Sequence, residues 1–107
     1  MTKRTETLEG YVVDIACLRK YPQDELLERA RAHTRACSLE GHCVESGYGL
    51  VAENGRVALL DAKATPKVLE AVRGSRRERG IRLSATRADR AGEWKTLDVR
   101  EAPGPST

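Results

Sequence analysis

The residues of this chain best suited to soft-metal or thiol chemistry are three cysteines and a histidine: Cys17, His33, Cys37 and Cys43. Only three cysteines and two histidines occur in 107 residues, yet two of each lie within residues 31–43. Three thiolates and one imidazole are one of the ligand sets of structural zinc sites. We therefore interpret the four residues as one metal site with zinc as the foremost ion. Copper(I), iron and iron–sulfur centres also accept these ligands.

The spacing of the cysteines leaves other interpretations open. Zinc fingers and ribbons contain two cysteines separated by two to four residues, and this chain has no such pair. Free cysteines are often small buried apolar side chains, and His33 would then be a hydrogen-bonded core residue. A Cys37–Cys43 disulfide that leaves Cys17 free would make the chain a thiol redox protein. We expect His42 to be a loop residue or a partner of the ligands, because neighbours in the chain rarely point at one ion.

Local patterns indicate which elements hold these residues. Residues 9–18 are rich in β-branched side chains and predict a strand that ends near Cys17. Residues 23–37 predict a single helix, on which His33 and Cys37 share a face one turn apart. Cys43 follows after a loop that contains a glycine. We expect this loop to fold back over the helix and the helix to dock near Cys17. Asp14 is a polar residue on the strand, where a turn or cap role is the usual one.

The remainder of the chain predicts two hairpins around a second helix. Asn54-Gly55 joins two apolar runs and is a strong hairpin signal. Thr65 is a suitable N-cap and Pro66 a suitable first residue for a helix that we expect to end at Gly80. Two alternating strands follow around a turn near Ala91-Gly92.

The order of these elements predicts a mainly β (α+β) fold. Five strands with a helix between the third and fourth are typical of a small OB-like barrel, here with a helical Cys/His insertion between strands one and two. An open α+β sheet of the same elements is the alternative. The length predicts one domain, residues 1–107, with an ordered core of about 8–102 and flexible ends.

Charge and composition narrow the function classes. The net charge of +3 is mild, and the aromatic residues do not lie among the arginines, which argues against a nucleic-acid partner. An OB-fold module that binds single strands remains the alternative function, on the basis of a basic run made up of Arg73, Arg76, Arg77, Arg79, Arg82, Arg87 and Arg90. Catalytic motifs are absent, so we expect no enzyme. The sequence has neither a secretory signal nor an apolar span, so we expect a cytoplasmic protein with no membrane partner. The sequence identifies no protein partner.

Three short segments also resemble a known pattern: GYVVDIAC at residues 10–17, HTRAC at 33–37 and SGYG at 46–49. They are similar to the Gly-x-Val-x-Asp-x-x-Cys, His-Thr-x-x-Cys and Ser-Gly-Tyr-Gly motifs of a family of small uncharacterised bacterial OB-like proteins. The resemblance covers about residues 9–101 and implies that the three cysteines and His33 are motif positions. It implies no reaction.

Overall fold

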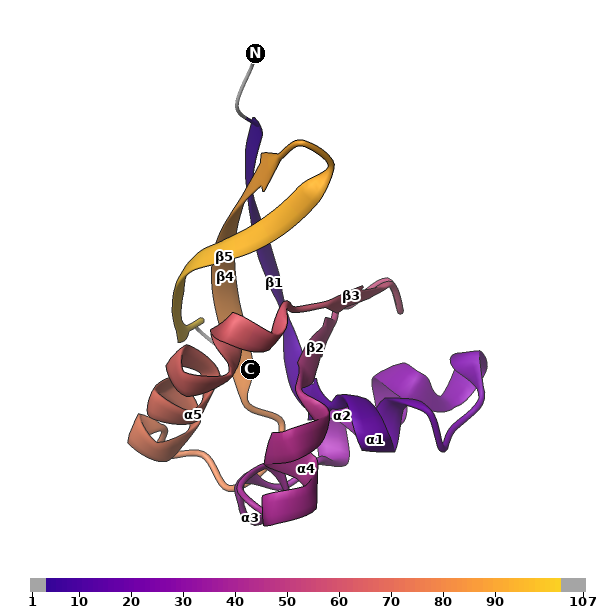
Figure 1. Ribbon diagram of the computed structural model, residues 1–107. Coiled ribbons are helices and arrows are strands. Elements are labelled where there is room, and N and C mark those ends of the chain that lie inside the picture. The colour runs from indigo at the N-terminus through magenta and orange to yellow at the C-terminus, as the bar shows by residue number, and fades with distance from the viewer. Residues whose placement is uncertain (1–3, 103–107) are drawn as a thin grey trace.

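Five antiparallel strands form one sheet in the order β3–β2–β1–β4–β5. The structure is a computed structural model that describes residues 4–102 (Figure 1). The long strand β1 lies at the centre, where its carboxyl end pairs with β2 and its amino end pairs with β4. The strands are β1 (Arg4–Asp14), β2 (Tyr48–Val51), β3 (Val57–Leu59), β4 (Arg82–Arg90) and β5 (Glu93–Glu101).

The helices cover both faces of the sheet and cluster at the carboxyl end of β1 (Figure 1). The α-helices are α1 (Ile15–Leu18), α2 (Leu26–Ala32), α3 (Arg35–Ser38), α4 (Gly41–Ser46) and α5 (Thr65–Gly74). Two 3-10 turns, η1 (Gln23–Glu25) and η2 (Ala62–Ala64), lead into α2 and α5. The four short helices therefore lie between β1 and β2 in sequence, where the helical insertion is expected.

The buried half of β1 serves two separate cores. Successive residues of a strand point to opposite faces, so Val12 packs in one core while Tyr11 and Val13 pack in the other. The Val12 core includes Val68 and Val72 of α5. Because both faces are covered, residues 10–14 are buried without interruption, and this buried stretch holds the residues that follow it in place.

The mixed α+β fold dominated by an antiparallel sheet is confirmed, but the closed barrel is not. Within residues 4–102 the edge strands β3 and β5 do not pair, and the sheet stays open. Strand β3 is only three residues long, and the chain then turns into η2 and α5, which pack against β5. Asp61 bridges the gap, because its Oδ1 accepts hydrogen bonds from the Thr96 N–H (2.9 Å) and hydroxyl (2.6 Å).

The single helix expected over residues 23–37 is wrong, because the chain is extended at His33 and Thr34. Backbone groups there pair with a distant segment instead of continuing the helix. The Gly80 N–H donates to the His33 carbonyl (3.0 Å), and the Arg35 N–H donates to the Glu78 carbonyl (2.7 Å). Thr34 then starts α3 as its N-cap, accepting a hydrogen bond from the Cys37 N–H at 3.1 Å.

Two further boundaries differ from expectation. Helix α5 ends at Gly74 rather than Gly80, because residues 78–80 are used in the pairing with His33 and Arg35. Strand β1 begins at Arg4 and ends at Asp14, so Cys17 lies on the one-turn helix α1. Residues 1–3 and 103–107, where flexible ends are expected, lie outside the described residues.

Both expected hairpins are present. Gly55 has a φ of 85° in the β2–β3 loop, and Ala91 and Gly92 have φ of 55° and 82° in the two-residue β4–β5 turn. Positive φ at both central residues is the backbone that a tight hairpin turn requires.

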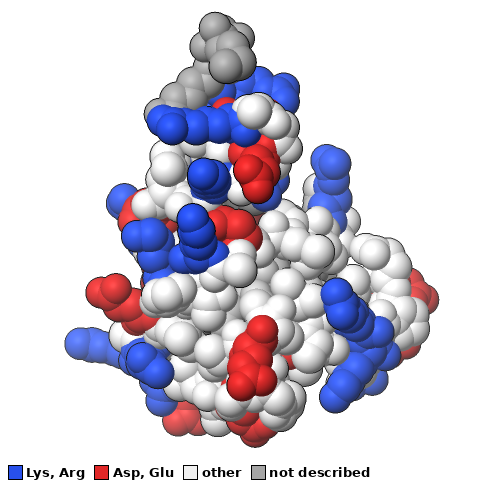
Figure 2. Space-filling model, in the orientation of Figure 1, with Lys and Arg blue, Asp and Glu red and all other residues white. Residues whose placement is uncertain are grey.

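Acidic and basic side chains are interspersed on the face drawn in Figure 2, notably over the β4–β5 hairpin. Among residues 4–102, no helix is long and apolar enough to cross a lipid bilayer.

Candidate metal centre

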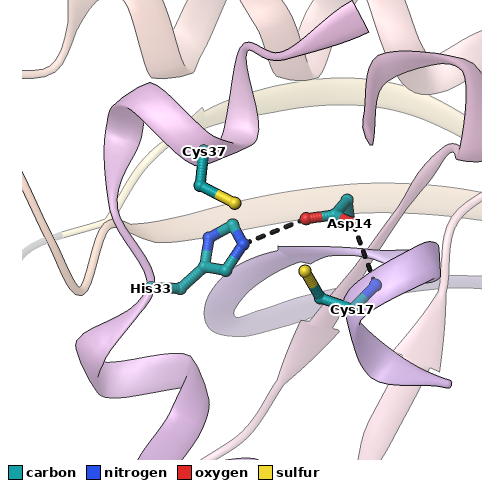
Figure 3. Close-up of side chains that lie close together, drawn as sticks. All are labelled: Asp14, Cys17, His33 and Cys37. Atoms are coloured by element: carbon teal, nitrogen blue, oxygen red, sulfur yellow. Dashed lines mark hydrogen bonds and ion pairs between the residues drawn. The ribbon is translucent and has the colours of Figure 1, made fainter. Parts of the chain in front are cut away.

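Four potential ligands from separate segments meet at the carboxyl end of β1 (Figure 3). Asp14 ends β1, Cys17 lies on α1, His33 lies between α2 and α3, and Cys37 lies on α3. Each residue offers one ligand atom, and these four atoms all lie within 4.8 Å of one another. Asp14 is fully buried, the His33 side chain is 9 % exposed, and Cys17 and Cys37 are half-buried.

Asp14 is the residue on which the site is built. Its Oδ2 accepts a hydrogen bond from the Cys17 N–H at 2.9 Å and so caps α1. Its Oδ1 lies 3.0 Å from His33 Nε2 (Figure 3). Burial alone would raise the pKa of Asp14, but hydrogen bonds from the Cys17 backbone and thiol, with the charge of His33, outweigh burial and lower it. The carboxylate is therefore a buried negative charge at neutral pH.

The other ring nitrogen of His33 is held by Ser38. His33 Nδ1 lies 3.1 Å from the Ser38 hydroxyl oxygen, which also lies 3.2 Å from the Thr34 carbonyl oxygen. The single hydroxyl proton can be given to only one of these two acceptors. Ser38 therefore donates to Nδ1 when Nε2 carries the ring proton, and donates to Thr34 when Nδ1 carries it.

The thiols of Cys17 and Cys43 lie in surroundings that favour the protonated form. Burial raises the pKa of Cys17 to about 12, and hydrogen bonding to Asp14 and the charge of Asp14 add to the effect. Burial likewise raises the pKa of Cys43 to about 12, together with the charge of Asp14 and a hydrogen bond to it. A bound cation would reverse this preference, because it attracts thiolate and carboxylate alike.

Of the four residues expected to form the site, Cys17, His33 and Cys37 are brought together with Asp14. Cys43, on α4, is 1 % exposed and is outside this group of four, although its thiol affects and is affected by Asp14 and Cys37. Asp14 fulfils the cap role expected of it and also joins the cluster. The only sequence signal for this second role is its position three residues before Cys17.

Cys43 belongs to a second group of potential ligands, with Glu40 and His42. One ligand atom from each of these three residues lies within 4.8 Å of the other two. The His42 and Glu40 side chains are exposed, and His42 Nε2 lies 3.8 Å from Glu40 Oε2.

A cavity of about 250 Å³ opens onto the first group. Cys17, His33 and Cys37 line one part of it. The rest of its wall is mainly apolar and is formed by Val13, Leu18, Tyr21, Leu26, Arg29, Ala30, Ala32 and Thr34. A ligand bound between the two thiols would therefore remain reachable from outside.

Known proteins add no assignment to this geometry. No protein family model matches the chain, and no curated protein or solved structure is significantly similar to it. The function is therefore argued from the site itself.

Proposed function

We propose that this chain binds a soft or borderline metal ion, zinc foremost, between Cys17, His33 and Cys37. The observation that carries the proposal is the meeting of four ligand atoms within 4.8 Å, contributed by segments far apart in the sequence. Around tetrahedral zinc, sulfur, nitrogen and oxygen ligands are about 3.3–3.8 Å apart, given bonds of about 2.0–2.3 Å. A small contraction of the group would bring it to that geometry.

The charge of the group supports a cation. Asp14 is ionised and fully buried, so it contributes a full negative charge to the ligand group. Two thiols that give up their protons add further negative charge, which a divalent ion balances. Copper(I) or iron would find the same ligands acceptable.

His33 is arranged to serve as a ligand. When Nδ1 carries the ring proton it can donate to Ser38, which in turn donates to the Thr34 carbonyl. Nε2 is then left with its lone pair facing Asp14 and the thiols. Histidine ligands are typically fixed in this way by a hydrogen bond from the second ring nitrogen.

Two residues compete for the fourth position. Asp14 is within reach of the other three ligands, and Cys43 interacts with both Asp14 and Cys37. With Asp14 the set is two thiolates, an imidazole and a carboxylate. With Cys43 it is three thiolates and an imidazole.

We propose a binding role rather than catalysis, and a carrier or sensor rather than a purely structural ion. Burial raises the pKa of Cys17 to about 12, which argues against a nucleophilic role for this thiol because the thiolate is the nucleophile. The cavity beside Cys17 and Cys37 leaves one side of the ion open to a small ligand, unlike the closed shell of a structural zinc site. The ion would also tie α3 to β1 and stabilise the fold.

Elemental analysis of protein purified under reducing conditions, with free-thiol counting, tests the proposal. We expect stoichiometric metal in the wild type, loss of it in Cys37→Ser and His33→Gln, and retention in His42→Gln, which changes the other histidine. Metal-free protein whose thermal stability does not change when zinc, copper or iron is added would refute the proposal.

A thiol redox protein is the second candidate, supported by one observation. The sulfur atoms of Cys17 and Cys37 lie within 4.8 Å of each other, so Cys17 could become the disulfide partner of Cys37. The raised pKa of Cys17 and Cys43, about 12 in each case, argues against this role, because thiol–disulfide exchange needs thiolates. Titratable thiols that disappear under mild oxidation, without bound metal, would favour this candidate.

A further inference from the structure

The second ligand group lies directly beside the first and is open to solvent. Glu40 and His42 have side chains that are 57 % and 70 % exposed, whereas Cys43, the third member of the group, is buried. The carboxylate, the imidazole and the thiol are all ligands for borderline divalent ions. Because Glu40 makes no side-chain cap to α4, its carboxylate is not used in holding the helix.

Building on the metal site proposed above, we propose that Glu40, His42 and Cys43 form an outer site that captures a divalent cation and passes it to the inner one. The two groups share no residue but lie next to each other, because α4 contacts both α3 and β1, and the Glu40 N–H donates to the Cys37 carbonyl at 3.2 Å. The sequence alone argued against this arrangement, because His42 and Cys43 are neighbours in the chain. The short helix α4 nevertheless brings both within reach of Glu40.

The transfer needs no oxidation or reduction. The ion first binds the Glu40 carboxylate and the His42 imidazole at the surface. Cys43 loses its proton to water and binds through sulfur, and Cys37 and Cys17 then do the same. As the inner ligands bind, the bonds to Glu40 and His42 break, so the ion keeps protein ligands throughout.

The cavity on the other side is a poorer route for a cation. Its walls are mainly apolar, so a hydrated ion would lose water there without gaining ligands until it reached the thiols. Among residues 4–102, its lining includes no carboxylate to attract cations, and the Arg29 guanidinium in that lining lies 4.5 Å from the Tyr21 ring centroid and is paired with Glu25 at 3.3 Å. Glu40 attracts them instead.

Rapid mixing of the reduced, metal-free full chain with Co²⁺ tests the proposal, because thiolate-to-cobalt absorption reports the filling of the inner site. The test variant is Glu40→Gln combined with His42→Gln. The matched control is Glu45→Gln, an exposed glutamate on the same helix that is outside the ligand group. We expect the double variant to load about tenfold more slowly, as loss of an attracting charge and ligand predicts, with an unchanged final absorption and Kd.

Loading of the double variant at the rate of Glu45→Gln would overturn the outer site while leaving the inner site intact. No thiolate-to-cobalt absorption in the wild type would instead refute the metal site itself. A variant with Cys17→Ser and Cys37→Ser distinguishes the outer site from the inner site further, because it removes the inner site only. It should bind Co²⁺ weakly through one thiolate, and adding His42→Gln should abolish that binding; absence of such binding counts against the outer site.

Discussion

Asp14 concentrates several partners on one buried carboxylate. Its oxygens receive the Cys17 N–H and face His33 Nε2, while the thiols of Cys17 and Cys43 also interact with it. Without metal, this network pairs the charge through hydrogen bonds to protonated thiols. If the proposed ion binds, the same atoms would become its ligands or the immediate neighbours of its ligands. The charge of Asp14 is thus paired both without and with the proposed ion. The two states differ in whether the thiols keep their protons.

Ser38→Ala should weaken metal binding without removing a ligand. The hydroxyl fixes the ring of His33 through Nδ1, and losing such a partner typically lowers metal affinity about 10–100-fold. Competition with a chelator of known affinity measures the effect. Ser84→Ala, on β4 and outside the site, is the control and should leave the affinity unchanged. Equal affinities in both variants would show that Ser38 does not position His33.

The metal-free protein should lose stability at high pH. The folded-state pKa values of Cys17 and Cys43 are raised from 9.0 to about 12, so their stabilising contribution is complete below pH 9 and is lost as pH rises toward 12. Tyr48, whose burial raises its pKa from 10.0 to about 12, adds to the loss above pH 10. Urea unfolding at a series of pH values checks this, and Cys43→Ser should reduce the slope. A free energy of unfolding that stays constant from pH 9 to 11 would contradict it.

The residue types in the sequence predicted some members of the candidate site. The other members are brought there by the packing of segments that are distant in the chain. Cysteine and histidine are rare enough in this chain that Cys17, His33 and Cys37 could be grouped from the sequence. Asp14 could not, because an aspartate at a strand end usually serves as a cap, and its second partner, His33, is distant in the chain. The exact place of Cys43 depends on how α4 folds back, which no local pattern specifies.

At the level of elements, the break between α2 and α3 determines the position of two proposed ligands, His33 and Cys37. A continuous helix would have placed His33 and Cys37 one turn apart on a single face. Instead the extended His33–Thr34 step pairs with residues 78–80, as the isolated bridge between Thr34 and Arg79 records. Sequence patterns report local preferences, so they predicted the helix but could not predict its interruption by a segment more than forty residues away.

Gly80→Ala should destabilise this break. Gly80 has a φ of 64°, and an added Cβ would lie 2.8 Å from the Arg31 carbonyl oxygen. A strained backbone of this kind costs about 1–3 kcal/mol, and the contact would push residues 78–80 away from His33. Chemical denaturation and metal titration should show both lower stability and weaker binding.

Gly74→Ala provides the contrast. Gly74 ends α5 and an added Cβ would meet no atom within 4 Å. This substitution should be neutral or stabilise the fold by about 0.4–1 kcal/mol. Equal destabilisation by both substitutions would show that the close approach of Gly80 to Arg31 is unimportant.

On the scale of the whole molecule, the predicted number of strands and their antiparallel pairing are correct. Whether the sheet closes into a barrel could not be predicted from the sequence. Whether the two edge strands meet depends on sheet curvature and on what fills the gap, not on hydrophobic alternation. Here Asp61 and the following η2 and α5 occupy the position between β3 and β5. A cavity of about 600 Å³ remains over the sheet, and its lining includes Trp94 and Arg87 but also Glu6 and Glu9.

The mixed charge of that cavity predicts weak binding of single-stranded nucleic acid. Arg87 is paired with Glu6 at 2.6 Å, so it is not free for a phosphate. We expect fluorescence anisotropy with a labelled oligonucleotide to show only weak association that falls steeply with salt. Tight binding at physiological salt that disappears in Arg76→Ala/Arg77→Ala would instead establish a nucleic-acid-binding module.

Trp94 is an optical reporter at the β4–β5 end of the molecule, and it is separate from the cobalt absorption at the cluster around Asp14. This single tryptophan lies near the β4–β5 turn, with the guanidinium of Arg87 4.7 Å and that of Arg4 6.0 Å from its ring centroid. The turn is at the opposite end of the sheet from α3 and α4 (Figure 1). Its emission therefore follows the hairpin, while thiolate-to-cobalt absorption follows the cluster around Asp14. If the two signals change together during denaturation, the sheet transmits unfolding from one end to the other as one cooperative unit.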